Sequence, residues 1–237
     1  MDAGSAAGRV AGPAMTREAA ARPEGFAADV LASIATVRIV PVVTIDDAHD
    51  APALASALVS GGLPIVEITL RTPSAMDALR RTAAEVPAAI VGAGSVTSAA
   101  AAVAAIDAGA RFIVSPGLDE GVISTALDAG VPVIPGIATA TELMRAMNLG
   151  VGVVKLFPAE VLGGVDLIRA LSAVWPDVHF MPTGGISPAN VGDYLALGQV
   201  LAVGGSWMVP RAAVEARDWA SVTVEAGAAA ELAQVSP

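Results

Sequence analysis

The chain has 237 residues, 54% hydrophobic and 15% charged, so it is long enough for one large domain and too apolar for a disordered protein. Its formal net charge of -10 argues against a broad binding surface for nucleic acid or anionic lipid. It has no cysteine, which excludes disulfides, thiolate metal sites and a cysteine nucleophile, and its two histidines, His49 and His179, are too far apart in sequence to favour a histidine metal site.

Two segments bear on the expected location of the protein. Residues 1–25 mix Gly, Ala, Arg, Glu and Pro without an apolar core, so we expect a flexible, disordered leader and no secretory signal. The uncharged stretch Val86–Ile106 is interrupted by proline, glycine and hydroxyl residues, which indicates a strand, a turn and a helix instead of a membrane span. These features predict a cytoplasmic protein.

A short amphipathic segment, Phe26–Thr36, predicts an N-terminal helix, and a regular alternation of strands and helices follows it. Short β-branched runs, separated by helical patterns rich in Ala and Leu, begin near Arg38, Pro64, Ala88, Arg111, Val131, Gly152, Val178 and Val200. Eight such units predict a single (β/α)8 TIM barrel over residues 26–237. An open doubly wound sheet is the alternative, but the glycine-rich turn that it needs is absent from RIVPVVTIDD, around the first strand.

Three helix starts are also predicted. Thr72–Pro73 and Ser187–Pro188 each place a capping hydroxyl before a proline, which is favoured at the first helical position. Thr139 and Glu142 have the spacing of a capping box.

Two strands carry charged residues on an otherwise apolar pattern. In LPIVEITLRT, alternation puts Glu67, Thr69 and Arg71 on one face, and the positions between them are apolar and suit a layer of helices outside. In GVVKLFPAE the same alternation places Lys155 opposite two apolar side chains. Glu67 and Lys155 are therefore predicted to point into the barrel, where an unpaired charge is costly.

Lys155 is the only lysine of the chain, beside twelve arginines. A buried ion pair with Glu67, or a lysine that snorkels to an exposed strand end, would be an ordinary explanation. Arginine, however, is the better residue for ion pairs and phosphate, and only lysine can lose its proton and attack a carbonyl. Burial among apolar side chains increases the neutral fraction of an amine. The composition alone therefore makes Lys155 a candidate for forming a Schiff base.

Glycines and polar residues collect where the predicted strands end, the face on which barrels of this kind place their chemistry. PTGGISPAN and VGGSW each place a glycine pair after one of the last two strands. One such pair also suits a tight turn, but two of them indicate backbone N–H groups that bind a phosphate or carboxylate.

From VRIVPVV to GGSWMVP the chain resembles the family of 2-keto-3-deoxy-6-phosphogluconate aldolase, also called 4-hydroxy-2-oxoglutarate aldolase. The members of this family are class I (Schiff-base) aldolases with a (β/α)8 barrel. The motifs that carry the resemblance are VEITLRT, VGAGSVT, SPGL, IPGIAT, KLFPAE, the pair Gly163–Gly164, PTGGISPAN, YLAL and GGSW.

The resemblance implies a role for each matching position. Lys155 would form the Schiff base with the C2 ketone, and Glu67 would be the general acid and base. Arg71 would bind the substrate carboxylate with Ser95, which stands where the family motif GAGT has threonine. Pro116 and Phe157 would wall the pyruvate pocket. The implied phosphate-binding residues are Thr183, Gly184, Gly185, Gly205 and Ser206.

The reaction implied is cleavage of 2-keto-3-deoxy-6-phosphogluconate to pyruvate and glyceraldehyde 3-phosphate, and of 4-hydroxy-2-oxoglutarate to pyruvate and glyoxylate. No metal or cofactor is expected, and the resemblance suggests a homotrimer. Three alternatives stay open: preference for the 6-phosphogalactonate analogue, a pyridoxal-phosphate protein, and a non-catalytic ligand-binding barrel.

Overall fold

A computed structural model describes residue 22 and residues 25–235. The predicted leader, residues 1–25, lies outside the described residues except for Arg22 and Gly25. The strands are β1 (Ile39–Val43), β2 (Ile65–Thr69), β3 (Ile90–Gly94), β4 (Ile113–Val114), β5 (Val133–Ile134), β6 (Gly136–Ile137), β7 (Val153–Leu156), β8 (His179–Phe180) and β9 (Val203–Gly205). Each predicted strand start lies within three residues of an observed one.

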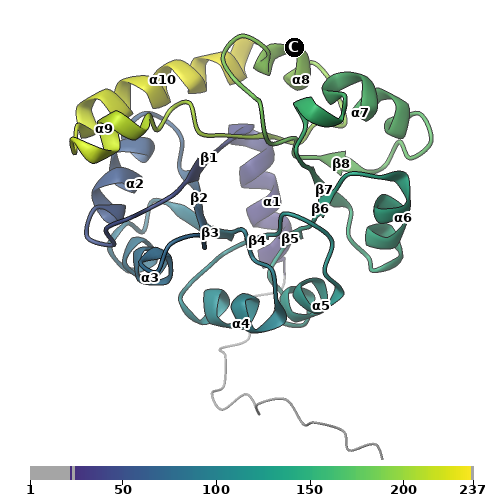
Figure 1. The fold of residues 1–237 in the computed structure, drawn as a ribbon, viewed down its shortest axis with the longest axis horizontal. Helices are drawn as coiled ribbons and strands as arrows, with labels where there is room; N and C mark the ends of the chain where they lie inside the picture. Colours follow the sequence, from purple (N-terminus) through teal and green to yellow (C-terminus); the bar gives the residue numbers. More distant parts are fainter. Residues whose placement is uncertain (1–21, 23–24, 236–237) are drawn as a thin grey trace, which may run out of the picture.

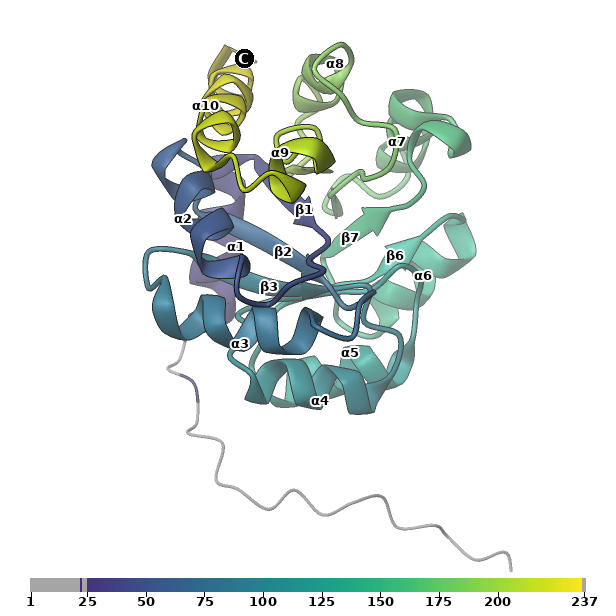
Figure 2. The ribbon, with the colours of Figure 1, turned by 60° about the vertical axis from the view of Figure 1, so that its left-hand side comes forward.

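Helices alternate with these strands. They are α1 (Phe26–Val37), α2 (Ala51–Ser60), α3 (Ala75–Glu85), α4 (Ala99–Asp107), α5 (Glu120–Asp128), α6 (Ala140–Asn148), the 3-10 helix η1 (Glu160–Leu162), α7 (Gly164–Ser172), α8 (Val191–Leu195), α9 (Arg211–Glu215) and α10 (Trp219–Val235). Figures 1 and 2 show the strands at the centre of the molecule and most helices around them.

All strand pairs are parallel, in two sheets of order β5-β4-β3-β2-β1-β9 and β6-β7-β8. β5 and β6 are consecutive in the chain and are separated only by Pro135, which has no N–H to donate. Single bridges join Phe180 to Val200 and Thr183 to Gly204, between β8 and β9. The fold is therefore α/β, with two parallel sheets linked by single bridges and with all strands pointing the same way.

The buried side chains form two clusters, which confirm the predicted alternation along β2 and β7. Val66 and Ile68 of β2 pack in the larger cluster with the surrounding helices, as does Val154 of β7. Ile65 and Val153, one residue away, lie in the smaller inner cluster, to which α1 contributes Val30 and Ile34. Glu67 and Lys155 each lie two residues after one of these, so their side chains are on the same face of their strands as the inner cluster.

One of the three predicted helix starts is confirmed. Thr139 and Glu142 form the expected capping box at α6. The Thr72–Pro73 prediction is wrong by two residues, because the Thr72 hydroxyl donates to the carbonyl of Ile45 in the β1–α2 loop and α3 begins at Ala75.

The Ser187–Pro188 prediction is wrong by three residues. The N–H and hydroxyl of Ser187 both donate to the side-chain oxygen of Asn190, and Asn190 is the residue that precedes α8.

The stretch Val86–Ile106 forms β3 and most of α4, as predicted. No helix in the described part of the chain is long and apolar enough to cross a membrane.

Candidate active site

Lys155 and Glu67 meet on the inner side of the sheet. Lys155 is 5% exposed and Glu67 is fully buried, and Nζ of Lys155 donates to Oε1 of Glu67 over 3.4 Å. The other carboxylate oxygen of Glu67 is buried and has no hydrogen-bond partner among the described residues. The pair therefore leaves one carboxylate oxygen free to handle a proton.

Small residues make room for this pair. A Cβ atom on Gly94 would lie 2.1 Å from Oε1 of Glu67, so only glycine fits there without moving the carboxylate. Gly136 is the register partner of Lys155 on the neighbouring strand. The ring of Phe157 lies beside the amine, with its centroid 5.3 Å from Nζ. The amine thus lies between an aromatic face and a carboxylate, shielded from bulk water.

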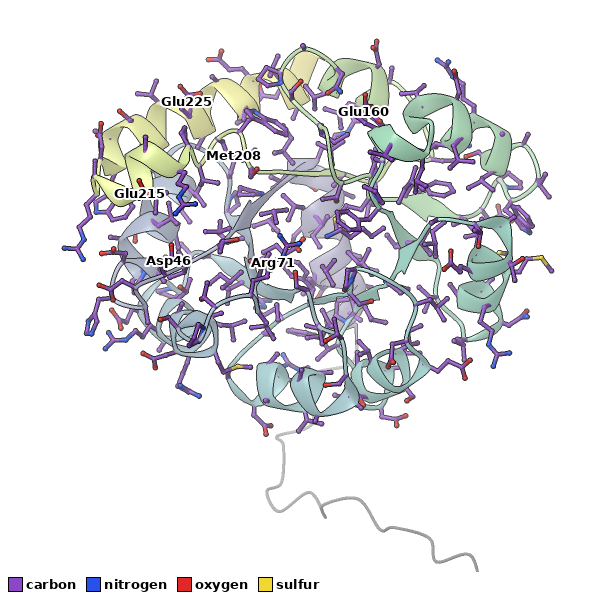
Figure 3. All side chains as sticks on the ribbon, in the orientation of Figure 1. Asp46, Arg71, Glu160, Met208, Glu215 and Glu225 are labelled. Atoms are coloured by element: carbon purple, nitrogen blue, oxygen red, sulfur yellow. The ribbon has the colours of Figure 1, made fainter. Side chains whose placement is uncertain are left out.

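Arg71 and Ser95 form a second polar group at the ends of β2 and β3. Ser95 has a positive φ of 57°, and its hydroxyl accepts a hydrogen bond of 3.0 Å from Nε of Arg71. The two terminal nitrogens of Arg71 have no ion-pair or hydrogen-bond partner in the part of the chain that the structure describes. Figure 3 shows Arg71 near the centre of the molecule. Its guanidinium is free to bind a carboxylate with two parallel hydrogen bonds.

The two glycine pairs, Gly184–Gly185 and Gly204–Gly205, lie side by side, because Thr183 and Gly204 form a β-bridge. A Cβ atom on Gly204 would lie 2.4 Å from the Thr183 hydroxyl, so the glycine permits this close approach. Gly184 and Gly185 have positive φ angles of 99° and 81°. Among the described residues, no acceptor is bonded to either of their N–H groups. Two free donors at a turn form a site for an anion.

One cavity unites these groups. It is lined by Val42, Glu67, Thr69, Arg71, Ser95, Lys155, Phe157, Thr183, Gly184, Gly185, Ile186, Gly204, Gly205 and Ser206. Its ionisable members are one acidic residue, Glu67, and two basic residues, Arg71 and Lys155, in a protein of net charge -10.

Of the sequence-predicted site residues, only Pro116 does not line the cavity. Its backbone instead lies against Gly136, at 2.3 Å from the position that a Cβ atom there would take. Gly204, which belongs to the predicted glycine pair of VGGSW, also lines the cavity, as do three residues that were not predicted: Val42, Thr69 and Ile186. Thr69 and Ile186 stand inside the motifs VEITLRT and PTGGISPAN, so their place in a motif was the available signal.

The arrangement defines a class of protein: an enzyme that attacks an anionic carbonyl compound with an amine. The buried amine is a nucleophile for a carbonyl carbon, the adjacent carboxylate can move protons, and the arginine and free N–H groups can bind anionic ends of a small molecule.

Comparisons with known proteins agree with this chemistry. The family model described as KDPG and KHG aldolase matches residues 30–224. The KHG/KDPG aldolase of Escherichia coli is 46% identical over 202 residues, which cover 85% of this chain and 95% of that protein. The 2-dehydro-3-deoxy-phosphogluconate aldolase of Pseudomonas aeruginosa is 48% identical over 185 residues, covering 78% of this chain and 84% of that protein.

A solved structure of KDPG aldolase from Legionella pneumophila, with pyruvate captured at low pH as a covalent carbinolamine intermediate, has a TM-score of 0.81 and 39% identity to this chain, and the match covers 84% of this chain and 97% of that one. The chain belongs to the KDPG and KHG aldolase family, a family of carbon–carbon lyases.

Proposed function

We propose that this protein is a class I aldolase that cleaves 2-keto-3-deoxy-6-phosphogluconate to pyruvate and glyceraldehyde 3-phosphate, and that it also cleaves 4-hydroxy-2-oxoglutarate to pyruvate and glyoxylate. The observation that carries the proposal is the only lysine of the chain, buried with its amine 3.4 Å from a buried carboxylate. Membership of the KDPG and KHG aldolase family supports the choice of substrates.

In the first step, the neutral amine of Lys155 attacks the C2 ketone and forms a carbinolamine. Loss of water gives a protonated imine, which accepts electrons from the neighbouring carbon–carbon bond. Phe157 shields the amine from water. Glu67 accepts the proton that the amine releases and passes it to the departing hydroxyl group, which leaves as water, so the carboxylate is ionised again for the second step.

In the second step, Glu67 removes the proton of the C4 hydroxyl. The C3–C4 bond breaks, its electron pair forms an enamine with the imine carbon, and the aldehyde product leaves. Glu67 then returns a proton to C3, and hydrolysis of the imine releases pyruvate and restores the free amine. The oxygen of Glu67 without a hydrogen-bond partner is the one suited to this exchange.

Arg71, Ser95 and the glycine loops hold the two ends of the substrate. The free terminal nitrogens of Arg71 suit the carboxylate next to the ketone, and Ser95 fixes the guanidinium through Nε. Phe157 is assigned to the wall of the pyruvate pocket, whereas Pro116 packs against Gly136 and does not line the cavity. Gly184, Gly185 and the neighbouring loop residues Thr183, Gly205 and Ser206 are assigned to the phosphate, which backbone N–H groups bind without lysine.

The decisive experiment is borohydride reduction in the presence of pyruvate, followed by arginine-specific digestion and mass spectrometry. Because the chain has one lysine, a side-chain adduct is expected only on the peptide of residues 146–169. A folded protein without a pyruvate-sized adduct on that peptide would overturn the mechanism. Initial rates with the phosphogluconate and phosphogalactonate compounds then decide between the two sugar acids, and a coloured purified protein would favour pyridoxal phosphate.

We also propose that the two sheets together form a closed eight-stranded barrel over residues 26–237. The bridges between β8 and β9 and the continuity of β5 with β6 support this closure. A homotrimer and a cytoplasmic location remain predictions, which light scattering and cell fractionation would test.

A further inference from the structure

A second cavity lies behind the loop that carries Gly184 and Gly185. It is lined by Glu160, Gly163, Gly164, Val165, Asp166, Asn190, Asp193 and Tyr194, none of which lines the substrate cavity. The loop of Gly184 and Gly185 is bonded to residues of this second cavity, so groups on that side can influence the N–H donors on the substrate side.

Glu160 contacts the loop through its backbone and its side chain. Its N–H donates to the carbonyl of Gly184 over 3.1 Å, and the preceding N–H, from Ala159, donates to Thr183 over 2.9 Å. A Cβ atom on Gly185 would lie 2.5 Å from Cγ of Glu160, so the side chain packs directly on this glycine. Figure 3 shows Glu160 beside α7, away from Arg71 at the centre.

Tyr194 holds the Glu160 carboxylate in this place. Tyr194 is 1% exposed, and its hydroxyl donates to Oε1 of Glu160. Gly164 provides the space, because a Cβ atom there would lie 2.5 Å from the tyrosine oxygen and 3.0 Å from the carboxylate oxygen. The Glu160 carboxylate thereby lines the second cavity and not the substrate cavity.

Asn190 holds the same loop from α8. Its side-chain nitrogen donates to the carbonyl of Gly185 over 3.0 Å, and its side-chain oxygen accepts the N–H of Ser187 over 2.8 Å. Asn190 directly precedes α8 and Tyr194 lies four residues later on that helix, so both contacts come from α8 and its capping residue.

We propose that Glu160, Tyr194 and Asn190 act as positioning residues that fix the Gly184–Gly185 turn for the anionic end of the substrate. Glycine adopts positive φ easily but is also the most flexible residue, so two adjacent glycines need outside support to keep both N–H groups aimed at one point. Support that exists before binding lowers the cost of ordering the loop. The proposal rests on the proposed function, since it concerns the phosphate end of that substrate.

The test compares a phosphorylated with an unphosphorylated substrate. In Tyr194→Phe we expect the KM for 2-keto-3-deoxy-6-phosphogluconate to rise about fivefold to tenfold, from the loss of one hydrogen bond that fixes the loop. The kcat and KM for 4-hydroxy-2-oxoglutarate should stay within about twofold, because its second carboxylate is attached directly to C4 and does not extend to the position of the phosphate on C6. Equal changes for both substrates, or no change in a folded variant, would refute the proposal.

Three further variants complete the design. Glu160→Gln keeps the packing and an acceptor for Tyr194, so it should behave like the parent protein. Glu160→Ala removes an exposed side chain, and it should reproduce the substrate-selective rise in KM even if Tyr194→Phe folds poorly. Thr82→Val loses a buried hydroxyl hydrogen bond in α3 and should leave the selectivity unchanged.

Binding of inorganic phosphate, measured by calorimetry, separates this proposal from the proposed function. We expect Tyr194→Phe to bind phosphate about fivefold to tenfold more weakly than the parent protein. Equal affinity would refute the positioning role, whatever the parent protein cleaves. A parent protein that binds phosphate but forms no pyruvate adduct would refute the proposed function alone.

Discussion

Gly94→Ala is a small change aimed at one atom of the site. The new Cβ atom would lie 2.1 Å from Oε1 of Glu67 and 2.6 Å from its Cγ. Gly94 does not have a positive φ, so alanine can adopt the backbone conformation and the clash alone decides the outcome. The carboxylate oxygen must retreat, and it is the same oxygen that accepts the hydrogen bond from Lys155.

The size of the effect follows from the distance. An ordinary contact of 3.4 Å, against the 2.1 Å available, would require the carboxylate oxygen to withdraw by about 1.3 Å. A displacement of that size in a group that transfers protons costs about 100-fold in rate, or about 2.7 kcal/mol in the barrier. Overpacking should also lower the free energy of unfolding by about 1 to 3 kcal/mol.

Two assays separate proton transfer from formation of the Schiff base. Borohydride trapping with pyruvate reports attack by Lys155, which the substitution leaves in place. Exchange of the pyruvate methyl protons with deuterium, followed by NMR, reports the proton transfer assigned to Glu67. In Gly94→Ala we expect trapping to reach the parent's final extent, although more slowly because Glu67 also accepts the proton from the amine, and both exchange and turnover to fall by about 100-fold.

Gly61→Ala is the matched control. Its Cβ atom would lie 2.5 Å from that of Ala226, between α2 and α10 and outside the cavity lining, so it should lose stability without losing turnover. If Gly94→Ala is folded and exchanges methyl protons at the parent rate, the position of Glu67 does not control proton transfer and the reasoning fails.

Three further predictions concern Lys155, Ser95 and Glu142. Lys155→Arg keeps the charge but removes the amine nucleophile, so a folded variant should show no turnover and no pyruvate adduct; appreciable activity would contradict the mechanism. Ser95→Ala removes the acceptor for Nε of Arg71, and we expect the KM for both substrates to rise about threefold to tenfold. An unchanged KM would show that binding of the substrate carboxylate does not depend on Ser95. The backbone N–H of Ala138, followed by the hydroxyl and N–H of Thr139, lowers the pKa of Glu142 below its ordinary value of 4.5. A lowered pKa stabilises the folded state above pH 4.5, and this contribution is lost as the pH falls through the folded-state pKa. Glu142→Gln should therefore melt at a lower temperature than the parent at neutral pH, and the difference should shrink in acid; a constant difference would contradict the linkage.

The sequence was sufficient for features that follow from local alternation. The parity of Glu67 and Lys155 follows from period-two patterns, and the spacing of the β-branched runs places the strand starts. Thr139 caps its own helix, so its role could be predicted without tertiary structure.

Features that depend on distant partners could not be predicted in this way. The Thr72 hydroxyl donates a hydrogen bond to the carbonyl of Ile45 instead of capping a helix, and these two residues are close only in the folded chain. Val42 lines the cavity because β1 pairs with β2 in a register that places it beside Glu67, and its side chain is an ordinary apolar one. The contact between Tyr194 and Glu160 joins residues 34 positions apart and has no sequence signal of its own.

The solitary, enclosed lysine has a consequence for chemical labelling. Because Lys155 is the only lysine and is 5% exposed, the outer surface offers no lysine side chain to amine-selective reagents. A reagent small enough to enter the cavity would modify one side chain per molecule, and pyruvate should protect that side chain. The fraction of molecules labelled at this side chain would then measure the fraction of competent sites in a preparation. Attachment to a solid support through lysine would require a reaction at Lys155 itself, and it would therefore inactivate the site.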